Sequence, residues 1–396
     1  MGLGPGGLGG PAPTEHAWLG PALLVGFGVV SAGGPLAIMA LYLPQSAGLP
    51  ARDLFFGLVG GVICFLPALW VWASYSARIA SAGGLYAFVR EAAGPRWAGL
   101  QAILWALSYF LYLPYTVTYV VFYLLPWIFP SLPRVTLDLA EVALPVGIFA
   151  LVWQGRRATF VLLAASAMAQ VVAVGLLGFA FWHGGGIAYP APPPLNLPVG
   201  LAASARISTL FVCLSLLLFL GGETRGGAPA VRRALLVSFT VAAVVSLFGA
   251  WLLTGGVSGS IPGVGLARLY AGRTASLALG LGVVASVVSL IVAEYVSLSR
   301  LWHSASGIAV DRAVRWIGFA MVTADVISLA GPRRFYVDLL PPSLVALFLS
   351  QLVAFAAHPL FARRYSRVAV PGLMIVALAC AWAIYGLLSV FGGAGF

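Results

Sequence analysis

The sequence predicts an all-α integral membrane protein that crosses the bilayer about eleven times. Of its 396 residues, 61% are hydrophobic and 8% are charged, and the mean hydropathy is +1.03. Soluble globular domains do not have this composition. The apolar runs long enough to span a bilayer fall at residues 19–43, 54–77, 97–129, 135–153, 158–182, 200–222, 233–254, 275–299, 313–330, 338–361 and 369–392.

The first of these spans contains a break near its middle. Gly33 and Gly34 directly precede Pro35. Proline removes a backbone donor, and paired glycines do not hold a helix. Because unsatisfied backbone groups are costly in lipid, a span broken at mid-depth predicts a binding site that faces half-helix ends and free amides. The alternative is a kinked helix that packs closely through its small residues.

The later spans are continuous apolar runs. The third is long and contains Pro114, so we expect it to be tilted or bent. The ninth, residues 313–330, is the shortest. The three cysteines, Cys64, Cys213 and Cys380, lie inside apolar spans and have no metal-ligand spacing.

The arginines predict the orientation of the spans. All 21 basic residues are arginines, and fourteen of them fall in segments that face the cytoplasm if the N-terminus is inside, against seven in outer segments. This places the tail, residues 1–18, in the cytoplasm and the proline-rich connector, residues 183–199, outside. The net charge of +11 is scattered between the spans, which predicts contact with membrane lipid and no nucleic-acid partner.

Two loops resemble the amino acid–polyamine–organocation (APC) family of transporters. The segment 77–95 is similar to the first cytoplasmic loop of that family, although Ala80 stands where a proline is usual and Phe88 replaces a tyrosine. The segment 222–238 aligns without gaps with the loop between the family's helices 6 and 7. The resemblance covers about residues 20–390.

The resemblance implies the leucine-transporter fold, a 5+5 inverted repeat with discontinuous helices 1 and 6. Its first repeat would be residues 19–182, its second repeat residues 200–361, and its final helix residues 362–396. In such repeats the site lies near mid-membrane, where helices 1 and 6 unwind.

The expected substrate-binding residues come from these two helices. In the first span, amides from Ser31 to Pro35 would bind a substrate carboxylate. In the sixth span, the resemblance places the break near 211–215. Polar side chains there would cap the freed backbone groups, and Phe211 would gate the pocket. The alternative is that the buried Ser and Thr residues form ordinary contacts between helices. The predicted set is Ser31, Ala32, Gly33, Gly34, Thr209, Phe211 and Cys213.

Polar residues inside spans are scarce and therefore informative. Glu294, in the eighth span, is the predicted coupling residue, since a desolvated carboxylate there can bind a proton at cellular pH; the alternative is an ion pair with Arg300. Gln170 falls near where some proton-coupled APC transporters have a lysine. On the third span Tyr112, Tyr115 and Tyr119 share one helical face and either line the substrate path or pack.

The sequence therefore predicts a secondary active transporter of the cell membrane, an amino acid permease that is proton-coupled or an exchanger. Sodium coupling, and an amine, polyamine or nucleobase substrate, remain alternatives. A non-transporting scaffold is a further alternative, which the broken first span disfavours. We expect no enzyme, no cofactor and no metal site, because no catalytic constellation, metal cluster or nucleotide-binding motif is present in the sequence.

Overall fold

The computed structural model describes residues 17–191, 197–255, 261–365 and 370–391, and the regular structure there is helical apart from one isolated bridge between Leu19 and Thr224. The first half contains α1 (Pro21–Ser31), α2 (Pro35–Ala37), η1 (Ile38–Tyr42), α3 (Leu43–Ala47), η2 (Ala51–Asp53), α4 (Leu54–Ser76), α5 (Leu85–Ala93), α6 (Pro95–Tyr119), η3 (Val120–Leu124), α7 (Leu125–Ile128), α8 (Arg134–Gln154) and α9 (Arg156–His183). The second half contains α10 (Leu197–Ser208), η4 (Thr209–Glu223), α11 (Gly227–Leu253), α12 (Pro262–Ser306), α13 (Val310–Ser328), α14 (Pro332–Tyr365) and α15 (Val370–Phe391).

Ten helical segments of the described chain are long and apolar enough to cross a bilayer. The remaining long helix, α13, has 19 residues, which is about 28 Å at the rise of an α-helix. It differs from the ten because every stretch of 18 residues in it contains four charged residues, Asp311, Arg312, Arg315 and Asp325, whereas each of the ten has such a stretch with at most two. The predicted eleven spans correspond to these ten segments and α13, which matches the predicted ninth span.

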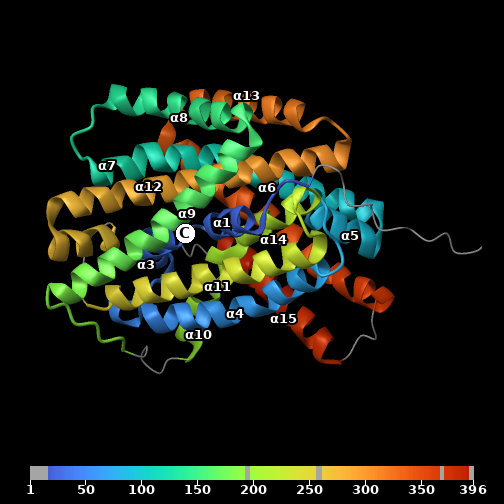
Figure 1. The fold of residues 1–396 in the computed structure, drawn as a ribbon, viewed down its shortest axis with the longest axis horizontal. Helices are drawn as coiled ribbons and strands as arrows, with labels where there is room; N and C mark the ends of the chain where they lie inside the picture. The colour runs from blue at the N-terminus through green and yellow to red at the C-terminus, as the bar shows by residue number, and fades with distance from the viewer. Residues whose placement is uncertain (1–16, 192–196, 256–260, 366–369, 392–396) are drawn as a thin grey trace, which may run out of the picture.

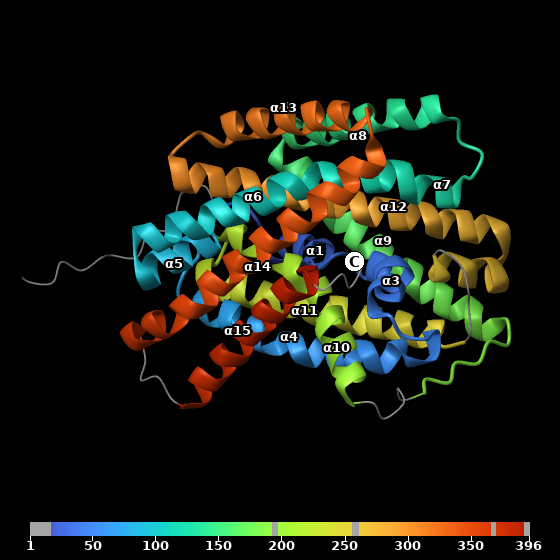
Figure 2. The same ribbon diagram turned by 180° about the vertical axis from the view of Figure 1, so that it is seen from behind.

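The helices form one bundle with α1 near its centre (Figures 1 and 2). In both views α8 and α13 lie side by side at one edge, while α4, α10 and α15 lie at the opposite edge. Many of the large exposed side chains are apolar, among them Ile103, Met168, Phe319 and Leu378. Such a surface suits the hydrocarbon core of a bilayer, and the protein is a multi-pass membrane protein.

The first span is interrupted where the sequence predicts. The α-helix α1 ends at Ser31, and the chain turns through Gly33 and Gly34, whose φ angles are 90° and 70°. Side chains other than glycine's rarely adopt these angles. Helix then resumes with Pro35 at its first position, where the missing N–H does no harm.

The sixth span is discontinuous in a different way. It changes from the α-helix α10 to the 3₁₀-helix η4 at Thr209, and η4 continues for 15 residues without a gap. Such a length is unusual, because 3₁₀ segments seldom exceed four residues. Since no glycine occurs between residues 209 and 220, tightening of the helix takes the place of an open break.

The eighth span is longer than the sequence suggests. The helix α12 covers 45 residues, but Gly272 inside it has φ 83° and ψ −177° and divides it in two. The predicted span 275–299 lies entirely in the second part. The third span contains Pro114 within α6 and continues through the π-helical η3 into α7.

We expect α13 to cross the membrane together with the ten apolar segments, which places the N-terminus in the cytoplasm, as the arginines favour, and the C-terminus outside. Single cysteines introduced at Gly185 and Ser306 into a variant without the three native cysteines would report the sides. A membrane-impermeant thiol reagent applied from outside should label position 185 and leave position 306 unlabelled. The reverse pattern, or labelling of both positions, would show that the topology is wrong.

Candidate functional site

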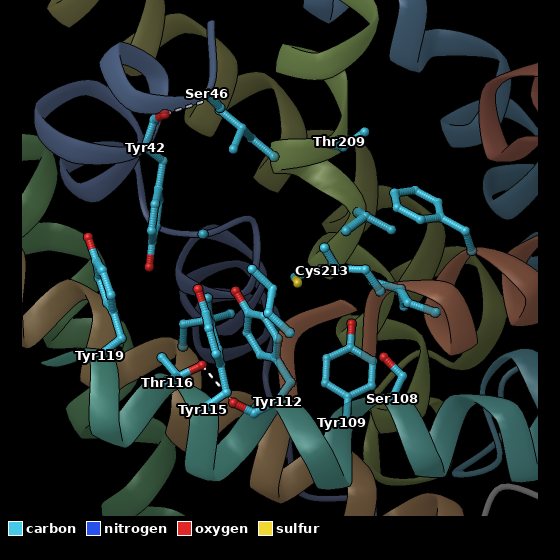
Figure 3. A pocket seen from close by; sticks show the side chains of 18 of the residues that line it. Tyr42, Ser46, Ser108, Tyr109, Tyr112, Tyr115, Thr116, Tyr119, Thr209 and Cys213 are labelled. Carbon is cyan, nitrogen blue, oxygen red and sulfur yellow. Dashed lines mark hydrogen bonds between the residues drawn. The ribbon is translucent and has the colours of Figure 1, made fainter. Parts of the chain in front are cut away.

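A cavity of about 130 Å³ lies in the middle of the bundle, beside the interruption of the first span (Figure 3). Its walls come from the α1–α2 connection, η1, α3, α6, η4, α12 and α14. The lining residues are Gly33, Tyr42, Gln45, Ser46, Ser108, Tyr109, Tyr112, Tyr115, Thr116, Tyr119, Thr209, Leu210, Val212, Cys213, Leu290, Tyr336, Leu340, Leu344, Leu347 and Phe348. None of these described residues is charged, so the cavity combines hydroxyl groups with apolar surface.

Tyrosines of α6 form one wall of the cavity (Figure 3). The ring of Tyr115 stacks on that of Tyr336 from α14, with centroids 4.7 Å apart, and its hydroxyl donates to the Tyr336 hydroxyl at 3.2 Å. Tyr119 donates to Gln45 of α3 at 3.4 Å. The tyrosines that share a face of the third span therefore line the cavity, and they connect α6 to α3 and α14 there.

Three of the seven predicted substrate-binding residues line the cavity, namely Gly33, Thr209 and Cys213. No hydrogen bond joins the amide of Gly33 to another described residue. The Thr209 hydroxyl is 2.6 Å from the Arg206 carbonyl, one turn back, and so satisfies backbone where α10 gives way to η4. Cys213 lies one 3₁₀ turn after Leu210 on the same side of η4.

The other four predicted residues lie away from the cavity. Ser31 and Ala32 are fully buried, and the Ser31 hydroxyl donates to the Phe27 carbonyl. Phe211, expected as a gate, packs between Phe65 and Phe239, with ring centroids 5.6 and 5.4 Å away. Its position follows from the threefold period of the 3₁₀ helix, which turns residue 211 away from the face of residues 210 and 213.

Gly34 faces a polar cluster between α9 and α12. A Cβ atom built on Gly34 would lie 2.2 Å from the Ser286 hydroxyl and 2.5 Å from Gln170 Oε1. Ser286 donates to Gln170 Oε1 at 2.8 Å, and the Gln170 amide donates to Ser166 at 3.3 Å. Gln170 therefore lies at the interruption of the first span, but a neutral amide cannot take up a proton at this position.

Glu294 lies on α12 one turn after Leu290, which lines the cavity. Its side chain is fully buried, and neither carboxyl oxygen has a hydrogen-bond partner among the described residues. It acts electrostatically on four residues of the cavity wall, Tyr42, Tyr109, Tyr112 and Cys213. An unpaired carboxyl group therefore lies directly behind the cavity.

Arg300 does not pair with Glu294. Its guanidinium Nε donates to Glu223 Oε1 at 3.0 Å, at the end of η4. Trp18 donates to the other Glu223 oxygen at 3.1 Å, and the backbone amide of Leu19 donates to the Glu223 carbonyl. We name Trp18, Glu223 and Arg300 the seal, because they join the residues before α1 to η4 and α12, and η4 also packs against α5.

Sequence reasoning missed several lining residues, including Tyr42, Gln45, Ser46 and Tyr336. Tyr42, Gln45 and Ser46 follow the first break by eight to twelve residues in the same span, beyond the residues expected to supply amides. Tyr336 is distant in sequence from both breaks, and only the packing of α14 against α6 brings it to the cavity. In the described part of the chain, no group of three His, Cys, Asp or Glu residues lies close enough together to hold a metal ion.

The interrupted first span and the central cavity lie in an all-helical, multi-pass membrane protein, and likeness to solved structures shows that it has the leucine-transporter fold. A mutant of the manganese transporter of Eremococcus coleocola has a similar structure, with a TM-score of 0.62 and 14% identity over 97% of this chain and 90% of that chain. MhsT in complex with L-phenylalanine is similar at 0.60, with 15% identity over 94% of this chain and 98% of that chain.

A nucleobase-cation-symport-1 family transporter, in a closed conformation with bromovinylhydantoin bound, is also similar. Its TM-score is 0.62, with 13% identity over 96% of this chain and 93% of that chain. No protein-family model and no curated protein sequence matches the chain. At these identities the likenesses show the fold, and the fold is the one that the resemblance to APC transporters implies.

We expect the seal to shield the cavity from the cytoplasm at the end of the bundle near α5. In a variant in which Cys64 and Cys380 are alanine, Glu223→Gln keeps the side-chain size but leaves the buried Arg300 without its charged partner. We expect a small thiol reagent applied to the cytoplasmic face to label Cys213 faster in this variant than in its parent. The rate should rise about tenfold for each 1.4 kcal/mol of interaction lost between Glu223 and Arg300.

The matched control is Glu91→Gln, which removes an ion pair with Arg364 that is largely exposed at the same end. Exposed pairs contribute little to stability, so its labelling rate should match that of the parent. Equal rates in all three proteins would show that the seal does not control access.

Proposed function

We propose that the protein is a secondary active transporter, an amino acid permease that binds its substrate in the central cavity. The single observation that carries the proposal is the position of this cavity, which lies at the interruption of the first span between both ends of the bundle. A helix broken at mid-depth supplies polar backbone to a ligand where lipid cannot. A scaffold without transport has no need of such a cavity.

The composition of the cavity wall supports an amino acid with an apolar or aromatic side chain. At one side Gly33 offers an amide without a partner, which suits a carboxylate. The tyrosine hydroxyls and Thr209 provide further polar contacts. Leucines of α14 and Phe348 form the apolar side, where a hydrophobic side chain would pack.

Other substrate classes fit the cavity less well. A polyamine needs several acidic partners, whereas Glu294 is the one carboxylate that acts on the described wall residues. A divalent metal ion needs a cluster of ligands, and among the described wall residues Cys213 is the only acidic, histidine or cysteine side chain. A nucleobase is the second candidate, because flat rings stack well on a wall of tyrosines.

Glu294 is the proposed coupling residue. A fully buried carboxylate without a hydrogen bond or a cation is strongly disfavoured, so a proton on Glu294 would remove a large electrostatic penalty. Because Glu294 acts on the cavity wall, a bound substrate and this proton would influence each other. Proton-driven uptake is the direct consequence, and exchange of substrate for substrate needs no change at Glu294.

The first test replaces Gly33 with leucine. A non-glycine residue at φ 90° is strained by about 1–2 kcal/mol, and the new side chain would enter the space next to Leu210 and Ile38. We expect at least a tenfold loss in uptake of labelled apolar and aromatic amino acids by proteoliposomes. Gly175→Leu is the control, since Gly175 is exposed on α9 and no atom lies near its Cβ position.

Unchanged uptake by Gly33→Leu would rule out the cavity as the amino acid site. A parent protein that takes up labelled nucleobases and no amino acid would instead support the second candidate.

The second test replaces Glu294 with glutamine, which keeps the shape and removes the titrating group. Uptake driven by a proton gradient should fall to the level seen without a gradient, while exchange of internal for external substrate continues. Measuring both activities against pH separates coupling from structure. If the variant keeps the pH dependence of the parent, Glu294 serves only to hold α12 in place.

A further inference from the structure

A pair of buried carboxyl groups, distinct from Glu294, lies away from the cavity, between α6, α8 and α13. Glu141 of α8 and Asp325 of α13 are both fully buried. Glu141 Oε1 accepts hydrogen bonds from Thr118 of α6 and from Ser328 of α13, each at 2.6 Å. The Ser328 hydroxyl also lies 2.8 Å from the backbone carbonyl of Asp325, one turn back on α13, so Glu141 contacts the turn of α13 that follows Asp325.

The remaining oxygen atoms of this pair have no partner. Glu141 Oε2 and both carboxyl oxygens of Asp325 lack a hydrogen bond within the described chain. Buried polar atoms in native proteins are nearly always paired, and three such atoms in one place indicate a missing proton or ion. The hydrogen bonds are thus unevenly distributed over the four carboxyl oxygen atoms, because Glu141 Oε1 has two donors and the other three have none.

The surrounding charges do not neutralise the pair. The charged groups that act on Glu141 are Arg134 and Asp138, which form their own ion pair at 2.8 Å at the exposed start of α8, about two turns away. The group that acts on Asp325 is Glu141 itself. Tyr295 of α12 does not act as a donor to the pair either, because its hydroxyl donates to the Val314 carbonyl, about three turns of α13 before Asp325.

Two negative charges cannot both persist in this environment. Like charges repel far more strongly in a medium of low dielectric constant than in water, and each also loses its hydration. The two hydroxyl donors stabilise negative charge on Glu141. Asp325, which receives no donor, is therefore the group that carries a proton.

We propose that Glu141 and Asp325 form a second proton-binding site, in which Asp325 holds a proton at neutral pH while Glu141 carries the negative charge. The site is independent of the central cavity, since neither residue lines it. It links three helices, because Ser328 joins α13 to Glu141 of α8 and Thr118 joins Glu141 to α6. Loss of the proton would push α8 and α13 apart.

The location suggests what the site controls. Thr118 directly precedes Tyr119, which lines the cavity from another face of α6. The π-helical η3 begins at Val120, and such segments often mark places where a helix adjusts. In α8, Pro145 removes the amide that would otherwise bond the Glu141 carbonyl. The protonation state of the pair is therefore linked to how α6 packs against α8 and α13.

Infrared spectroscopy of the purified full-length protein tests the proposal, with the proton itself as the probe. The parent is Glu294→Gln, so that Glu294 contributes no signal and the outcome does not depend on the coupling role proposed for that residue. At neutral pH it should show the carbonyl stretch of a protonated carboxylic acid, which shifts in heavy water. Adding Asp325→Asn should abolish this band.

The matched control is Asp338→Asn, which changes an exposed aspartate on α14 and should leave the band unchanged. A second measurement requires no change at the site. Aspartate with a heavy carbon isotope in its carboxyl group, incorporated into the parent, should shift the band to lower frequency, whereas labelled glutamate should leave its position unaltered.

A band that survives Asp325→Asn, or no protonated band at neutral pH, would overturn the proposal. Adding sodium chloride, with choline chloride as the control salt, tests whether a sodium ion occupies the site instead of a proton. A band that sodium removes would place a sodium ion at the carboxylates and would also overturn the proposal. A band that is insensitive to sodium supports a proton on Asp325.

Discussion

The interruption of the first span is the constraint on which the rest of the structure depends. Gly33 and Gly34 hold backbone angles that other residues rarely adopt, and their amides lie far from water. Neighbouring helices must therefore approach closely enough to enclose the break. Gly26 and Gly28 allow this approach, because a Cβ atom on either would lie less than about 3 Å from Ala164 or from Ser238.

Close packing around the break separates two environments. On one side, Gly34 meets the neutral cluster of Gln170 and Ser286, where a hydrogen-bonded contact fixes the chain. On the other side, Gly33 meets the cavity with its tyrosines and leucines. The same few residues thus fix the backbone and border the cavity, which explains why the cavity lies at the interruption of the span.

Apart from Asp53, which pairs with Arg52 at 3.6 Å, the buried charged residues of the described chain lie in three places with different electrostatics. Arg300 and Glu223 neutralise each other at the seal. Glu294 is alone behind the cavity, and Glu141 with Asp325 forms a pair of equal sign. Since an uncompensated charge inside a membrane protein is expensive, the last two places are where protons would bind and leave. The proposed coupling and the proposed second site follow from the same physical requirement.

The sequence by itself determined the all-helical membrane class and the break, because hydropathy, length and a Gly-Gly-Pro motif act locally. It also indicated Gly33, Thr209 and the tyrosine face of α6, which line the cavity. Only the tertiary structure decided the rest. The 3₁₀ period of η4 turned Phe211 away, and the packing of α14 brought in Tyr336. The meeting of Glu141 and Asp325 depends on contacts across 184 residues of chain, which no local pattern encodes.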